Sequence, residues 1–209
     1  MDTSKQQATK ARVWTPANIV TLVRILLIPI FAVALLSPWP EWLPYPEFWA
    51  AWQPWIAAIV FAGISATDAV DGHLARSRNE VTDLGKFMDP LADKILVCAA
   101  MLALVELQAF PSWVALIIIA REFIVSGLRM LAAADGQIIA ASWYGKAKTF
   151  VTDIAIVFFL VMDSPAIAAS SIHAGFVVLS WVLMVAAVVL TIISMIDYLV
   201  KSKSVIGLG

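Results

Sequence analysis

The sequence is short of the residues that build soluble or disulfide-rich domains. Of its 209 residues only 14% are charged, two are histidine and one is cysteine. The single cysteine, Cys98, lies inside an apolar stretch, which excludes an intrachain disulfide. A net charge of −1 gives no overall indication of nucleic-acid binding. The chain also lacks an internal repeat and a low-complexity linker, so its dominant feature is apolar composition.

The apolar residues fall into six segments. They make up 62% of the chain, whereas soluble domains contain about 45–50%. A membrane-spanning helix needs about 20 residues, so six spans fill the length and leave no room for a separate soluble domain. The sequence therefore predicts an all-α integral membrane protein with six transmembrane helices, over residues 17–37, 53–75, 86–107, 112–133, 146–163 and 173–199.

The positive charges fall on one side of this predicted bundle. All 14 lysines and arginines lie on or near the side of the N-terminus, and the opposite connections contain none. The positive-inside rule then places both termini and the loops 76–85 and 134–145 in the cytoplasm. The stretch SPWPEWLPYPEFWAAWQPW suits an aromatic belt at the other interface. The expected parts are a cytoplasmic arm (1–16), a six-helix domain (17–200) and a cytoplasmic tail (201–209).

The first apolar segment has an alternative interpretation as a cleaved leader. The triplet at 32–34, Ala-Val-Ala, follows a short apolar core, as a signal-peptidase site does. The apolar run is nevertheless long enough to span a membrane. Asn18, Thr21 and Arg24 also form a polar stripe that a cleaved leader has no use for, so we expect a retained helix.

Four regularly spaced aspartates interrupt the apolar background. The stretch DAVDGHLARSRNEVTDLGKFMDPLADK contains Asp68 and Asp71 at i,i+3, then Asp89 and Asp93 at i,i+4. Each pair lies on one face of its helix, and the short polar loop makes the two helices antiparallel neighbours. We therefore expect the four carboxylates to converge on one pocket at the cytoplasmic end of the bundle.

Such a cluster of carboxylates is costly without a counter-charge. An aspartate in the middle of a membrane helix costs about 2.5–3.5 kcal/mol, and carboxylates in contact repel one another. One or two divalent cations remove both costs, and a ligand set made only of oxygen favours Mg²⁺ or Mn²⁺ over Zn²⁺. The alternative is a polar network that only holds the helices together, but fewer and uncharged groups would do that.

The residues between these aspartates suit a phosphate ligand. Gly72 and Gly85 remove side chains where a nucleotide or another backbone comes close, and Ala75 keeps the same face open. Arg76 offers a planar fork to a phosphate. Two metals facing a diphosphate would clamp it for an in-line displacement. The other polar residues of the stretch are expected to be tolerated neighbours or solvated loop charges: His73, Arg78, Glu80 and Asp83.

A second polar cluster is cationic. Arg121 and Arg129 are eight residues apart and share a helix face, and Lys146 and Lys148 begin the fifth segment. They predict a pocket for the phosphate of an acceptor substrate. The alternative is ordinary cytoplasmic flanking charge, which is weakest for Arg121 because it lies inside an apolar run. Two carboxylates are candidate partners that orient these cations, and the sequence does not choose between them: Glu122 and Asp153.

The stretch from Asp68 to Asp93 matches, in residue and spacing, the signature of the CDP-alcohol phosphatidyltransferase family, which the chain resembles. Members of this family are six-helix membrane enzymes, usually homodimers, that move a phosphatidyl group from a CDP-linked lipid to an alcohol and release CMP. Further blocks resemble those members whose acceptor is glycerol 3-phosphate: TPANIVTLVRILLIPIF, DPLADK, AREFIVSGLRMLAA and SWYGKAKT. The resemblance covers nearly the whole chain.

The resemblance implies a reaction and a set of roles. CDP-diacylglycerol and sn-glycerol 3-phosphate would give phosphatidylglycerol phosphate and CMP at the cytoplasmic face of a bacterial inner membrane. Asp68, Asp71 and Asp89 would hold two divalent cations, Mg²⁺ or Mn²⁺, and Asp93 would bind one of them and act as the general base. The CDP site would be lined by Asn18, Thr21, Gly72, Ala75, Arg76 and Gly85.

Three alternatives remain at this point. A synthase of the same family could use another acceptor and make cardiolipin or phosphatidylinositol phosphate. A membrane cation transporter could also coordinate ions with aspartates, although the chain has no inverted repeat and its aspartates cluster near one surface. A scaffold protein, like a transporter, would have no use for the pattern of Gly72, Ala75 and Arg76.

Overall fold

Helices, without any strand, make up the described part of the chain. The computed structural model describes residues 16–36, 47–78, 83–134 and 142–202. Six long helices coincide with the six apolar segments, which confirms the all-α prediction for these residues. A four-residue helix that the sequence did not predict lies between the last two. The helices are α1 (Pro16–Leu36), α2 (Glu47–Arg78), α3 (Asp83–Glu106), α4 (Ser112–Ala134), α5 (Trp143–Val161), α6 (Pro165–Ala168) and α7 (His173–Lys201).

The structure corrects the ends of the second and third segments. The helix α2 begins six residues before the predicted boundary at 53 and continues three residues past the one at 75, and α3 begins at Asp83 instead of residue 86. Apolar composition marks the part of a helix that faces lipid or core, whereas backbone hydrogen bonds extend a helix through polar residues as well. The predicted loop 76–85 is thereby reduced to residues 79–82, which lie outside the described part.

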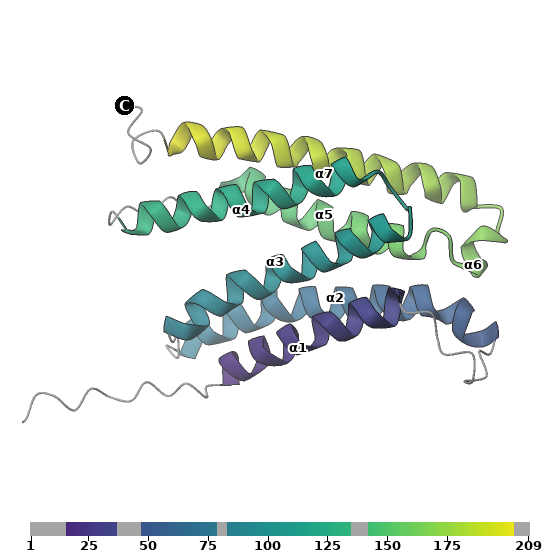
Figure 1. Cartoon of the computed structure of the whole chain (residues 1–209), viewed down its shortest axis with the longest axis horizontal. Coiled ribbons are helices and arrows are strands. Elements are labelled where there is room, and N and C mark those ends of the chain that lie inside the picture. Colours follow the sequence, from purple (N-terminus) through teal and green to yellow (C-terminus); the bar gives the residue numbers. More distant parts are fainter. Residues whose placement is uncertain (1–15, 37–46, 79–82, 135–141, 203–209) are drawn as a thin grey trace, which may run out of the picture.

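The long helices alternate in direction along the bundle. The N-terminal ends of α1, α3 and α5 and the C-terminal ends of α2, α4 and α7 all lie at one end, on the left of Figure 1. The short helix α6 lies at the opposite end. This alternation brings the aspartate-containing parts of α2 and α3 to the same end as the cationic parts of α4 and α5. The residues 1–15 and 203–209 of the predicted arm and tail lie outside the described part.

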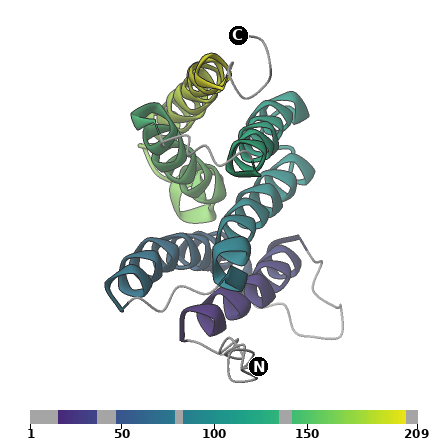
Figure 2. The ribbon, with the colours of Figure 1, turned by 90° about the vertical axis from the view of Figure 1, so that its left-hand side faces the viewer.

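The helix α3 lies between two groups of helices. Figure 2 shows α1 and α2 on one side of it and α4, α5 and α7 on the other. It packs against α1, α2, α4 and α5, while α2 also contacts α5 directly. Aromatic side chains pack between the helices. The ring centroids of Phe31 of α1 and Phe61 of α2 lie 6.2 Å apart, and Phe159 of α5 meets Trp181 of α7 edge-on at a centroid distance of 5.3 Å.

One helix of the described part is long and apolar enough to cross a membrane by itself, namely α7. Shorter apolar stretches run over Thr21–Leu36 and Ala51–Thr67. The helices α4 and α5 each carry three charged residues, which interrupt their apolar runs. Six spans therefore remain an expectation about the whole bundle. The charged residues of α4 and α5 line the cavity described below, except Lys148, which pairs with Glu122.

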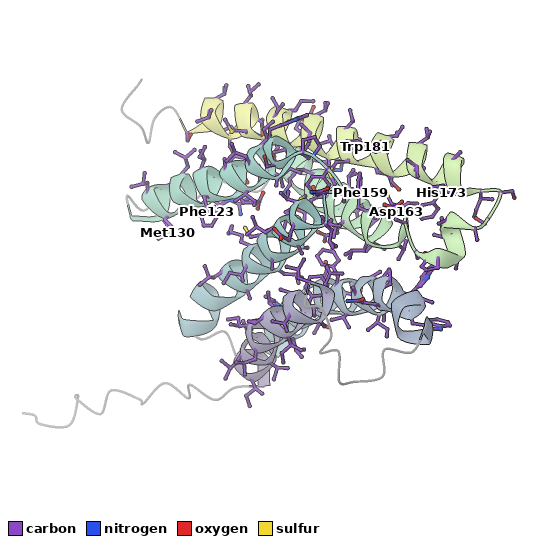
Figure 3. All side chains as sticks on the ribbon, turned by 45° about the vertical axis from the view of Figure 1, so that its right-hand side comes forward. Phe123, Met130, Phe159, Asp163, His173 and Trp181 are labelled. Carbon is purple, nitrogen blue, oxygen red and sulfur yellow. The ribbon has the colours of Figure 1, made fainter. Side chains whose placement is uncertain are left out.

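At the end of the bundle away from the cationic cluster, a histidine lies close to a carboxylate. Nε2 of His173, at the start of α7, lies 3.6 Å from Oδ1 of Asp163 (Figure 3). The pair forms because α6 folds the connection back, so that two residues ten positions apart meet.

Candidate functional site

A cavity of about 810 Å³ opens between α2, α3, α4 and α5. Its wall runs along α5 from Ser142 to Phe158, which is about 24 Å at 1.5 Å per residue. Polar side chains gather toward the N-terminal end of α5, and Phe61, Val157 and Phe158 close the other end. The polar lining consists of Ser65, Lys94, Arg121, Glu122, Ser126, Arg129, Ser142, Lys146, Thr149 and Asp153.

Three of the four cations predicted to bind an acceptor phosphate line this cavity: Arg121, Arg129 and Lys146. Arg121 and Arg129 reach it from the same face of α4, as their spacing predicts, and Lys146 reaches it from α5. Lys94 of α3 joins them, although the sequence had not assigned it to this pocket. Arg121 is buried, whereas Arg129 and Lys146 are exposed. The cavity therefore has both a buried cation and exposed cations in its lining.

The guanidinium of Arg121 is held from two sides. Its Nη1 donates to Oε1 of Glu122 at 2.8 Å, and its Nη2 donates to Oγ of Ser194 on α7 at 2.5 Å. Its Nε is buried and has no hydrogen-bond partner among the described residues. A buried N–H without a partner is costly, so the described residues leave one donor of Arg121 unsatisfied.

Lys148 has a different position from the other three cations. It is 2% exposed, it is not part of the cavity wall, and its Nζ donates to Oε1 of Glu122 at 2.5 Å. One oxygen of Glu122 therefore accepts from both Arg121 and Lys148. Of the two carboxylates that the sequence left open as partners, Glu122 makes these contacts. The described position of Lys148 favours neutralising Glu122 over contacting an acceptor.

The other carboxylate, Asp153, tethers a different pair of helices. Its Oδ2 accepts from Oγ of Ser65 at 2.7 Å, which joins α5 to α2 across the cavity wall. Nothing in the sequence pointed to Ser65, because a serine in an apolar helix normally bonds to its own backbone. Thr67, two residues further on, does so, donating to the carbonyl of Gly63 at 2.6 Å.

The aspartate motif adjoins this cavity along the backbone. The α2 wall of the cavity ends at Ala66, two residues before Asp68, and the α3 wall is Lys94, which follows Asp93. Asp68 and Asp71 lie in α2 and Asp89 and Asp93 in α3, and these two helices pack together. The structure does not describe side chains for several predicted site residues: Asn18, Asp68, Asp71, Gly72, Ala75, Arg76, Gly85, Asp89 and Asp93.

Two described residues of the polar stripe on α1 point inward. Thr21 is 3% exposed and Arg24 is 4% exposed, and α1 packs against α2 and α3. A buried arginine on a helix this apolar needs polar partners, so Thr21 and Arg24 face the protein and not lipid. This burial agrees with the expectation that the first segment is part of the bundle.

Comparison with known proteins identifies the family. Residues 14–193 match the family described as CDP-alcohol phosphatidyltransferase, and the chain belongs to it. It is 44% identical over 150 residues to the CDP-diacylglycerol–glycerol-3-phosphate 3-phosphatidyltransferase of Bacillus subtilis, covering 71% of this chain and 77% of that one. The enzyme of that same description from Escherichia coli is 35% identical over 192 residues, which cover 90% of this chain and 94% of the relative. A probable phosphatidylglycerophosphate synthase of Mycobacterium tuberculosis is 37% identical over 203 residues, with 97% and 88% covered.

Proposed function

We propose that this enzyme transfers the phosphatidyl group of CDP-diacylglycerol to sn-glycerol 3-phosphate, giving phosphatidylglycerol phosphate and CMP. The observation that carries the proposal is the cationic cavity of Arg121, Arg129 and Lys146 next to the aspartate motif. Binding a phosphate dianion requires several fixed hydrogen-bond donors. Acceptors without a phosphate, such as serine or free inositol, do not require them. The names of the relatives from Bacillus subtilis and Escherichia coli state the same reaction.

The acceptor phosphate binds to Arg121, Arg129 and Lys146. Arg121 lines the cavity and its Nε has no partner among the described residues, and the guanidinium groups of Arg121 and Arg129 offer planar, charge-assisted donors. Lys148 acts indirectly in this proposal, because it neutralises Glu122 and so leaves the cavity with net positive charge. This differs from the sequence-based expectation that all four cations contact the phosphate.

The aspartate motif provides the donor site. Asp68 and Asp71 are three positions apart in α2, and Asp89 and Asp93 are four apart in the adjacent α3. Residues at these spacings share a helix face, which supports the proposal. This set contains only oxygen donors and fits two divalent cations, Mg²⁺ or Mn²⁺. Bound there, such cations would neutralise the diphosphate and the departing CMP. The CDP moiety contacts the residues that the family resemblance assigns to it: Asn18, Thr21, Gly72, Ala75, Arg76 and Gly85.

The chemical step moves one proton. The hydroxyl oxygen of glycerol 3-phosphate forms a bond to the β-phosphorus of CDP-diacylglycerol, and the bond from that phosphorus to the CMP oxygen breaks. Asp93 takes the hydroxyl proton as the general base. Fixing the acceptor by its phosphate keeps the hydroxyl near the β-phosphorus, which converts a bimolecular encounter into a local one.

The proposal includes a membrane topology. Six long helices span the cytoplasmic membrane of a bacterium, with both termini and the site on the cytoplasmic side, and residues 17–200 form one domain. The charges that interrupt α4 and α5 are tolerated because they line the cavity or pair with one another. The diacylglycerol tails remain in lipid while the soluble acceptor enters from the cytoplasm. As the family resemblance implies, the enzyme works as a homodimer.

The decisive experiment supplies purified protein in detergent with CDP-diacylglycerol, Mg²⁺ and one acceptor at a time. The acceptors are glycerol 3-phosphate, glycerol, serine, inositol, inositol phosphate and phosphatidylglycerol, and the lipid product is identified by mass spectrometry. We expect CMP release and phosphatidylglycerol phosphate with glycerol 3-phosphate alone. Cardiolipin or phosphatidylinositol phosphate as the main product would assign another acceptor, and no CMP release with any acceptor would refute transferase activity.

A further inference from the structure

One aromatic residue contacts both arginines of the cationic cavity, Arg121 and Arg129. Tyr198 on α7 is fully buried, and its ring centroid lies 5.0 Å from the guanidinium carbon of Arg129 and 5.7 Å from that of Arg121. Nη2 of Arg129 also donates a hydrogen bond to the phenolic oxygen of Tyr198. A cation within about 6 Å of an aromatic ring is attracted to its π face. The ring therefore bridges two arginines that are eight residues apart on α4.

The neighbouring turn of α7 provides a second contact. Ser194 precedes Tyr198 by four residues, so both side chains lie on one face of the helix. Oγ of Ser194 accepts from Nη2 of Arg121 at 2.5 Å. The described cavity wall contains no residue of α7. This helix thus contacts the arginines from the side away from the cavity, and leaves their remaining donors for a ligand.

We infer that Tyr198 is a positioning residue for the acceptor-phosphate pocket, an inference that rests on the proposed function. A free arginine samples many rotamers, and binding an anion requires that this freedom be lost. The hydroxyl of Tyr198 limits the freedom of Arg129, whose side chain is otherwise exposed. The ring also stabilises two like charges held near each other before the phosphate arrives. Tyr198 thereby lowers the KM for the acceptor without contacting the substrate.

A purely structural role makes a different prediction. A buried tyrosine that only fills space would affect the stability of the bundle, and with it the use of both substrates. A positioning residue affects the acceptor alone, and it acts through Arg129. The two roles separate in the KM for each substrate and in the coupling between the two residues.

The test compares three variants of the full chain in detergent at fixed Mg²⁺: Tyr198→Phe, Tyr198→Leu and Thr191→Val. The phenylalanine keeps the ring and removes the hydroxyl, and leucine removes both. Thr191 is an equally buried polar residue of α7 and serves as the matched control. Among the described residues its hydroxyl bonds only within its own helix, at the carbonyl of Ala187.

We expect Tyr198→Phe to raise the KM for glycerol 3-phosphate about tenfold, the effect of losing one charge-assisted hydrogen bond. Tyr198→Leu should raise it further, and neither variant should change the KM for CDP-diacylglycerol by more than about twofold. Thr191→Val should leave both values close to wild type. An unchanged acceptor KM in Tyr198→Phe, or an equal rise for both substrates, overturns the inference. If Tyr198→Leu raises the acceptor KM no more than Tyr198→Phe does, the ring has no role in positioning the arginines.

A double-mutant cycle gives a second measurement. Because Tyr198 acts through Arg129, Tyr198→Phe should have almost no further effect on acceptor KM when Arg129→Met is already present. If the two substitutions instead raise the acceptor KM by factors that multiply, Tyr198 works independently of Arg129 and the inference is overturned. Failure of the proposed function is distinguishable from either result, because the wild-type protein would then not use glycerol 3-phosphate.

Discussion

Nζ of Lys148 lies 2.5 Å from Oε1 of Glu122, and this ion pair joins α5 to α4 between residues 26 positions apart. Both side chains are largely buried, at 2% and 13% exposure. The same carboxylate oxygen accepts from Arg121. One buried negative charge therefore balances two buried cations, one of which faces the cavity.

Removing the charge of Glu122 should destabilise the protein strongly. Glu122→Gln leaves Lys148 and Arg121 buried without a counter-charge, and breaking such a pair costs about 3–5 kcal/mol. The double variant Glu122→Gln with Lys148→Met should recover part of this loss, since it removes one of the two unpaired charges. The measurement is the thermal unfolding midpoint in detergent.

A matched control for this prediction is the exposed ion pair between Lys201 and Asp197, whose atoms lie 2.8 Å apart with 49% and 22% exposure. Lys201→Met should cost less than about 1 kcal/mol, because solvent screens such pairs. Similar losses for Glu122→Gln and Lys201→Met would contradict the account of the buried pair.

Lys146 should matter for the acceptor and not for the donor. It is an exposed cation at the cavity, without an ion pair among the described residues. Lys146→Ala should raise the KM for glycerol 3-phosphate about tenfold to a hundredfold, the range expected for one charge-assisted contact. Initial rates against each substrate in turn provide the measurement. Lys201→Ala, which removes a cation outside the cavity wall, is the control, and equal effects of the two variants would argue against a phosphate pocket.

Arginine at position 121 should not be replaceable by lysine. Arg121 uses two of its nitrogens on Glu122 and Ser194, and its Nε has no partner among the described residues. A lysine ammonium is a single point and cannot reproduce this fork. We expect Arg121→Lys to raise the acceptor KM at least about tenfold, as loss of a charge-assisted hydrogen bond does. Wild-type kinetics in this variant would show that charge alone is sufficient at this position.

Activity should require a divalent cation. Four aspartates in the motif supply only oxygen ligands, so chelation should abolish CMP release, and Mg²⁺ or Mn²⁺ should restore it. Circular dichroism before and after chelation checks that the helices remain folded. Full turnover after exhaustive chelation would exclude the metal from the mechanism.

Asp93→Asn should impair chemistry more than donor binding. The amide cannot accept the proton of the acceptor hydroxyl, so turnover should fall while CDP-diacylglycerol still binds. Asp68→Asn should weaken metal affinity as well as turnover. Donor affinity, metal dependence and turnover are measured side by side for the two variants. Near-normal turnover in Asp93→Asn would remove Asp93 from the role of general base.

The sequence by itself determined the number, order and direction of the long helices. Six apolar segments separated by polar stretches predict helices that alternate in direction, and the described part of the chain forms six long helices with alternating directions. The sequence also grouped Arg121, Arg129, Lys146 and Lys148, and three of these four line the cavity. For Arg121 and Arg129 this follows from their spacing, which puts both on one face of α4. The sequence placed the ends of α2 less well, since composition does not report where backbone hydrogen bonding stops.

Only the tertiary structure decided which cations line the cavity and which one pairs with a carboxylate. The choice of Glu122 over Asp153 as the partner of Arg121 and Lys148 depends on how α4 and α5 are rotated against each other. The contacts of Ser194 and Tyr198 with the arginines depend on the packing of α7 against α4. Periodicity along one helix carries no information about its rotation relative to a helix 70 residues away. That rotation is set by the fit of many side chains at once, and it separates the cations that face the cavity from the one that neutralises a carboxylate.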